Sequence, residues 1–155
     1  MIKLLITEYA LKKQEMEWKL HDIVSPIVHR LIKCYLMPIS ESYNHWKSEI
    51  ANSLREVKAL KGTNKFPTAK QIYDWTYGSY YDSVNNQRWM KAVIQEIQED
   101  YDILIDTPIY DLCLEINALC YNYFTWLSNV LSVNGFTSRK SIFDKIDKLI
   151  KQVNE

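Results

Sequence analysis

Glycine and proline are scarce in this sequence. Only 3 of the 155 residues are Gly and 4 are Pro, whereas the two together make up roughly 12% of an average protein. Sheet proteins need turn residues with unusual backbone angles at short intervals. The shortage of such residues therefore favours long helices joined by few loops.

The chain also lacks an excess of charge of either sign. It carries 19 Lys and Arg against 19 Asp and Glu, a formal net charge of zero. A protein that is held mainly by phosphates is normally basic. The balance counts against nucleic-acid binding as the main task, although it leaves room for a local basic patch.

Cysteines with the spacing of a disulfide framework or a zinc motif are missing. The 3 cysteines, Cys34, Cys113 and Cys120, are odd in number and lie within apolar helical patterns. No Cys-x-x-Cys spacing occurs among them. We expect buried thiols in a reducing compartment.

Long apolar runs are absent as well. The apolar run at the N-terminus ends at Glu8, too early for a signal peptide. No segment approaches the roughly 18 uninterrupted apolar residues of a membrane span. We therefore expect a cytoplasmic protein with no membrane partner.

What the sequence does contain is apolar residues at helical spacing along most of its length. In the first half of the chain, the pattern predicts a helix over 2–24, with 2–7 as its start or as a short strand, a helix from Ser25-Pro26 to Pro38, and a helix from Ser40 or Ser42 to Gly62. A loop over 62–67, a helix from Thr68 and a break over 82–87 follow. The second half is predicted to hold a helix over 89–101, a long helix from Pro108 to Gly135, and a last helix from Thr137 or Ser138. Residues 1–155 are thus expected to form a single all-α domain, an irregular bundle of six to seven helices.

One stretch carries a resemblance to a known family. The residues in question are His29, Arg30, Leu31, Ile32, Lys33, Pro38, Trp46, Ile50, Arg55, Val57 and Leu60, with Pro67 and Tyr81 further along. This pattern resembles the centre of the uncharacterised helical family called domain of unknown function 29. The resemblance spans residues 20–85 and implies an all-α fold, with no implied chemistry.

Motifs of known catalysis are missing. No Gly-x-Ser-x-Gly, no glycine-rich phosphate loop and no His-Glu-x-x-His run occurs. Glu17 and His21 share a helix face at metal-ligand spacing, and one such pair is too few for a site. We therefore expect no metal, no cofactor and no catalytic residue. The alternative is an enzyme site assembled from distant residues such as His29, His45 and Asp111.

Charge is segregated along the chain. Residues 55–70 hold five basic side chains, Arg55, Lys58, Lys61, Lys65 and Lys70, against one acidic, whereas residues 96–106 hold five acidic and no basic side chains. Such patches attract partners of opposite sign. They are also consistent with mutual pairing in the fold or with a solvated helix face.

An aromatic run lies between these patches. It consists of Tyr73, Trp75, Tyr77, Tyr80 and Tyr81, followed by Trp89. These rings span most of the circumference of a helix, so either the helix is central or some rings face outward. Exposed Tyr and Trp are enriched where proteins bind proteins.

We therefore expect a non-enzymatic helical interaction protein of the immunity, antitoxin or inhibitor type, with homo-oligomer formation as an open possibility. Its predicted binding residues for a protein partner are Tyr73, Tyr77, Tyr80, Tyr81, Trp89, Arg55, Lys58, Lys61, Lys65 and Lys70. The alternative is a nucleic-acid-binding module in which the basic 55–70 stretch contacts phosphates and the neighbouring rings stack on bases.

Overall fold

The computed structural model describes residues 22–59, 83–134 and 137–154. Residues 22–36 are helical, and the helices that follow are α2 (Tyr43–Asn52), α3 (Leu54–Ala59), α5 (Ser83–Tyr101), α6 (Ile109–Asn134) and α7 (Arg139–Asn154). No strand occurs in these ranges, which confirms the all-α class. Five labelled helices are counted rather than six to seven. Residues 2–21 of the first predicted helix, and the helix predicted from Thr68, lie outside the described ranges.

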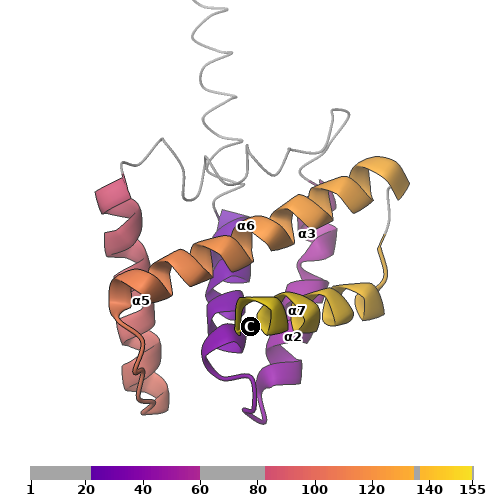
Figure 1. Ribbon diagram of the computed structural model, residues 1–155. Coiled ribbons are helices and arrows are strands. Elements are labelled where there is room, and N and C mark those ends of the chain that lie inside the picture. The colour runs from indigo at the N-terminus through magenta and orange to yellow at the C-terminus, as the bar shows by residue number, and fades with distance from the viewer. Residues whose placement is uncertain (1–21, 60–82, 135–136, 155) are drawn as a thin grey trace, which may run out of the picture.

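The helices form two crossed layers. Helix 22–36, α2 with α3, and α5 stand roughly upright in Figure 1, and α6 and α7 run across them. Helix α7 contacts both α6 and α2, and α5 contacts α6. Helix α6, with 26 residues, is long enough to span the whole layer of upright helices.

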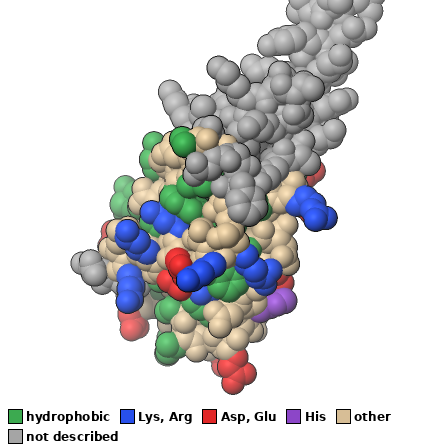
Figure 2. Space-filling model, turned by 90° about the vertical axis from the view of Figure 1, so that its right-hand side faces the viewer, with side chains coloured by type: hydrophobic (Ala, Val, Ile, Leu, Met, Phe, Trp, Pro, Cys, Tyr) green, Lys and Arg blue, Asp and Glu red, His purple; other side chains and the backbone are tan. Residues whose placement is uncertain are grey.

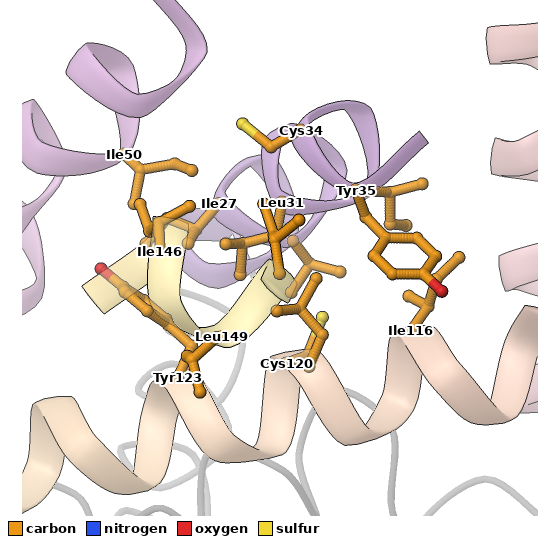
Figure 3. Close-up of a cluster of buried hydrophobic side chains, with 14 of the residues drawn as sticks. Ile27, Leu31, Cys34, Tyr35, Ile50, Ile116, Cys120, Tyr123, Ile146 and Leu149 are labelled. Atoms are coloured by element: carbon orange, nitrogen blue, oxygen red, sulfur yellow. The ribbon is translucent and has the colours of Figure 1, made fainter. Parts of the chain in front are cut away.

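One cluster of buried side chains joins the two layers. In Figure 3, Ile27 of helix 22–36 lies beside Ile146 of α7, and Leu31 points toward α6, which carries Tyr123 and Cys120. The largest fully buried side chains are Tyr123, Ile27, Leu31, Ile32, Ile50, Met90, Ile94, Ile97, Ile116 and Leu119. Burial of a large apolar side chain contributes about 1.5–3 kcal/mol, so this cluster is the main source of stability.

The buried thiols are part of the same cluster. Cys34, Cys113 and Cys120 are all free and buried, as the sequence predicts. Burial raises the pKa of Cys34 and of Cys120 to about 12 and raises that of Cys113. A thiol with such a pKa holds very little thiolate at neutral pH, so these residues are packing groups rather than nucleophiles.

Several helix ends lie where turn residues predict them. Helix 22–36 ends just before Pro38, and α6 begins directly after Pro108. The Oγ of Ser138 accepts a hydrogen bond from the N–H of Ser141 at 3.1 Å, which is the N-cap contact expected at the start of α7.

Three predicted boundaries are wrong. The chain is already helical at residue 22, so Ser25-Pro26 lies inside a helix, where burial of Val24, Ile27 and Val28 offsets the lost hydrogen bond. Residues 83–87 of the predicted break over 82–87 form the first turns of α5. The helix predicted from Ser42 onward is interrupted at Ser53 and continues as α3, because the Ser53 hydroxyl bonds to the Glu49 carbonyl at 2.9 Å.

A buried polar junction fastens α2 to α7. The Nζ of Lys47, whose side chain is only 5% exposed, lies 2.8 Å from Oδ1 of Asp147. The Tyr43 hydroxyl donates to the same oxygen at 2.6 Å. The ammonium group also lies 4.5 Å from the centre of the Tyr43 ring and 4.8 Å from that of Phe143. We call these four residues the α2–α7 junction.

Helix α5 ends in a Schellman turn. Asp102 has φ of 51°, the left-handed conformation that Asp tolerates better than most residues. The N–H of Ile103 bonds to the carbonyl of Gln98 at 3.3 Å, the contact that defines this turn. The turn directs residues 102–108 away from α5 before α6 begins.

Candidate functional site

Most of the predicted binding residues lie outside the description. Tyr73, Tyr77, Tyr80, Tyr81, Lys61, Lys65 and Lys70 fall between residues 60 and 82, and only the backbones of Lys58 and Trp89 are described. Arg55 is exposed on α3. Their role as a binding surface therefore stays a prediction.

The described part holds a charged groove between helix 22–36, α2 and α5. Its volume is about 440 Å³, and it is lined by Ser25, Pro26, His29, Arg30, Lys33, Glu49, Val93 and Glu96. His29, Arg30 and Lys33 share one side of their helix because they lie within one turn. The opposite side of that helix, with Ile27, Leu31 and Cys34, faces the core.

Glu49 links two basic side chains in this groove. Its carboxylate pairs with Nε of Arg30, and its other oxygen lies 2.6 Å from Nε2 of His45. Burial alone would raise the pKa of Glu49, but the hydrogen bond and charge of Arg30, with His45 and Lys33, lower it. Glu49 is thus ionised and fixed in place.

His29 is held neutral in the same groove. Burial and then the charge of Lys33 lower its pKa, while Glu96 on α5 acts in the opposite direction. At neutral pH its imidazole therefore has a free lone pair that can accept a proton or a hydrogen bond. The sequence suggested His29, His45 and Asp111 as one site. His29 lines the groove together with Glu49, and Glu49 also contacts His45, so the two histidines lie in one region. Asp111 lies in the exposed first turn of α6.

Two aromatic rings contact Lys33, which lines the groove. The rings of Trp46 and Tyr101 meet edge to face at 5.8 Å. The Nζ of Lys33 lies 5.9 Å from the Trp46 ring and 5.6 Å from the Tyr101 ring. This contact joins α2 to the end of α5 and so fixes where the loop after α5 starts.

The last turn of α5 and the loop after it carry the second feature, which we call the acidic tip. It consists of Glu99, Asp100, Asp102, Leu104 and Asp106. All four carboxylates are exposed, and within the described ranges none takes part in an ion pair. Leu104 is 96% exposed between them. In Figure 1 the tip lies at the lower end of α5, the same end of the molecule as the loop over 37–42.

Sequence reasoning found the acids of the tip but not its apolar centre. Leu104 belongs to an Ile-Leu-Ile run whose flanking residues, Ile103 and Ile105, are partly buried against the core, and the run reads as buried. Ile39 in the neighbouring loop is 99% exposed. The exposure of Leu104 and Ile39 could have been predicted from their positions just after residues that end a helix, because loops lie at the surface.

Other site classes have no support in the described part of the chain. In those residues, no group of three or more His, Cys, Asp or Glu side chains is arranged to hold a metal ion. None of the helices searched has the length and apolar character that a membrane crossing requires. Comparison with protein-family models, curated proteins and solved structures gave no match, so the resemblance to domain of unknown function 29 stays a prediction.

Proposed function

We propose that this protein is a non-enzymatic interaction module that binds a basic protein partner through the acidic tip. The observation that supports this proposal is the combination of four exposed, unneutralised carboxylates around a 96% exposed Leu104. An interface of this kind uses charge to steer encounter and an apolar centre to hold the partner.

The structure around the tip favours a binding role over a purely solvating one. The loop is anchored on one side by the Trp46–Tyr101 ring contact and on the other by partly buried Ile103 and Ile105. Its side chains are therefore presented from a defined backbone, which lowers the entropy that a partner must remove on binding.

Affinity capture from an extract of the native source tests the proposal. The bait is compared with a tip variant that carries Glu99→Gln, Asp100→Asn, Asp102→Asn and Asp106→Asn. A control variant carries Asp22→Asn, Glu56→Gln, Asp111→Asn and Asp144→Asn, which removes the same number of exposed carboxylates elsewhere. We expect a basic protein that survives nuclease treatment and is retained by the control but lost from the tip variant.

Two other results would redirect the assignment. Recovery of the partner by the tip variant at the wild-type level would contradict the proposal. Capture that is abolished by nuclease would instead favour the basic 55–70 stretch and nucleic acid.

The role in partner binding that the sequence predicts for the aromatic residues 73–89 is a separate proposal with its own test. Tyr77→Ala with Tyr81→Ala is expected to weaken partner binding while the thermal midpoint stays nearly unchanged. The experiment measures affinity for the captured partner together with thermal unfolding. A large loss of stability would show that these rings belong to the core instead.

A second candidate function follows from the groove. A neutral His29 beside ionised Glu49 in a hollow of about 440 Å³ is suited to accept a proton from a bound small molecule. The test is a panel of ester, amide and phosphoester hydrolysis assays. Activity that is lost in His29→Gln and kept in Asp111→Asn would favour an enzyme, and no activity above background would retire this candidate.

A further inference from the structure

A second hollow lies between the end of α6 and the start of α7, on the opposite side of the molecule from α5. Its volume is about 620 Å³, within the range of roughly 300–1,000 Å³ typical of small-molecule sites. Its lining residues come from α6, from the segment before α7, and from the first turns of α7. Figure 2 views this side, and Lys and Arg side chains gather on it.

One end of this hollow is built to receive an anion. The Ser138 hydroxyl caps α7 and donates to Oγ of Ser141 at 2.9 Å. The first backbone bond of the helix runs from the N–H of Ile142 to the carbonyl of Ser138 at 3.2 Å, so the N–H groups of Arg139 and Lys140 precede the hydrogen-bonded ladder. Such N–H groups, together with the helix dipole, favour a negative charge.

Lysine side chains strengthen this end. Ser141, Lys145 and Lys148 line the hollow and are spaced at i, i+4 and i+7, which places them on one face of α7. No ion pair in the described part of the chain involves either lysine. Two ammonium groups and the start of the helix therefore face the same volume.

Thr137 supplies an independent sign of a ligand. It lines the hollow and is only 6% exposed, yet no hydrogen bond of its hydroxyl occurs among the described residues. The hydroxyl oxygen is not one of the fully buried side-chain atoms without a partner, so it borders the hollow and is open to a water or a ligand there. A phosphate oxygen at the start of α7 is the acceptor that this hydroxyl lacks.

The other end of the hollow is suited to a ring. Trp126 and Val130 of α6 form an apolar wall, and the Trp126 ring is held 6.1 Å from the buried ring of Tyr123. Flat rings stack on such a tryptophan. Asp144 also lines the hollow, and its carboxylate can accept hydrogen bonds from hydroxyl or amino groups but would repel a phosphate placed beside it.

We propose that this hollow binds a small phosphorylated ring compound, of which a nucleoside monophosphate is the simplest kind. The phosphate lies at the start of α7, between Thr137 and the two lysines, and the ring lies against Trp126. The proposal does not depend on the partner-binding role of the acidic tip, because the two regions share no residue.

Calorimetric titration of the full chain tests this assignment with adenosine monophosphate, adenosine, ribose 5-phosphate and O-phosphoserine. We expect adenosine monophosphate to bind and each of the other three to bind at least about tenfold more weakly, since each lacks either the phosphate or the ring. Equal binding of O-phosphoserine and adenosine monophosphate would overturn the ring as part of the ligand. Failure of adenosine monophosphate to bind would overturn the proposal as a whole.

Variants locate the binding. Lys145→Gln with Lys148→Gln is expected to weaken binding of adenosine monophosphate about tenfold or more, because two charge-assisted contacts are lost. Thr137→Val is expected to weaken it about threefold. The matched control, Lys140→Gln with Lys151→Gln, removes two exposed lysines of α7 that do not line the hollow. Binding that is equally weakened in the control, or unchanged in the first pair, would place the ligand elsewhere.

Discussion

The α2–α7 junction and the acidic tip use charged side chains in opposite ways. At the junction, Lys47 is 4% exposed, and its charge is met by Asp147 and by two aromatic rings of the same chain. At the tip, four carboxylates face solvent, and no described residue pairs with them. The charge at the junction is neutralised within the protein, whereas the negative charge at the tip is open to neutralisation by a basic partner.

The comparison shows why exposure and pairing, rather than residue type, separate a structural polar group from an interaction surface. A buried charge must be paired because water is not available to solvate it. An exposed charge needs no pairing for stability, so the four carboxylates around Leu104 stay open to a partner. The following predictions test both halves of this contrast.

The largest expected effect comes from breaking the junction. Asp147→Ala leaves the buried Lys47 ammonium without its carboxylate, and we expect a loss of about 2 kcal/mol in the free energy of unfolding, reduced from the value for a fully buried pair because Asp147 is half exposed. Denaturant titration measures it. Asp144→Ala, an exposed position on the same helix, is the control and should change stability by less than about 0.5 kcal/mol.

Lys47→Met sharpens the same test. Methionine keeps the apolar stem between the Tyr43 and Phe143 rings, and Asp147 retains the Tyr43 hydroxyl and contact with water. We therefore expect a smaller loss than for Asp147→Ala. A larger loss from Lys47→Met would mean that the charge pair itself, rather than the avoidance of an unpaired ammonium, stabilises the junction.

Thiol accessibility separates the core from the surface. With pKa values raised to about 12 by burial, Cys34 and Cys120 should react with an aromatic disulfide reagent at neutral pH only when the protein opens. We expect very slow labelling of the native chain and rapid labelling of all 3 cysteines in denaturant. Rapid labelling of the native chain would contradict the packing around α6.

A smaller effect is expected from pH. The folded pKa of His29 lies below its ordinary value of 6.5, owing to burial and then to Lys33, with Arg30 lowering it and Glu96 and Asp100 raising it. The stability that neutral His29 contributes is therefore fully present above pH 6.5, the ordinary pKa of the unfolded chain. This stability is lost as the pH falls through the folded pKa of His29. Denaturant titrations between about pH 7.5 and about pH 5 should show this loss, and His29→Gln should reduce its slope. An unchanged slope would mean that His29 is not held neutral by the groove.

The smallest effect on stability is expected at the tip. The four-fold tip variant keeps the shape of every side chain, and Asn tolerates the left-handed backbone of residue 102. Its free energy of unfolding should stay within about 0.5 kcal/mol of the wild type. A clear loss would assign these carboxylates a structural role.

Local signals in the sequence predicted much of the fold. Pro108 and Ser138 mark the starts of α6 and α7 because their chemistry acts within one turn. Pro26 misled because its buried neighbours Val24, Ile27 and Val28 keep that segment helical. The polar residues 83–87 misled because they form the first turns of α5 instead of a break. Such an override by tertiary packing leaves no local trace.

The candidate sites were less accessible to sequence reasoning. The contact of Lys47 with Asp147 joins residues 100 positions apart, and the groove combines residues of three helices, so no spacing rule reveals either. A solvated helix face was one of the interpretations left open for the acids over 96–106, and these acids are exposed in the fold. Leu104 and Ile39 were not predicted, because an apolar residue in a short run reads as buried until the turn beside it is known.

Salt dependence of partner binding tests the central claim most directly. Affinity of the captured partner is measured against ionic strength for the wild type and for the four-fold tip variant. The account predicts a steep loss of affinity with salt for the wild type and a weak, nearly flat dependence for the variant, because the steering charges are gone. Equal affinity and equal salt dependence for the two proteins would contradict the acidic tip as the binding surface.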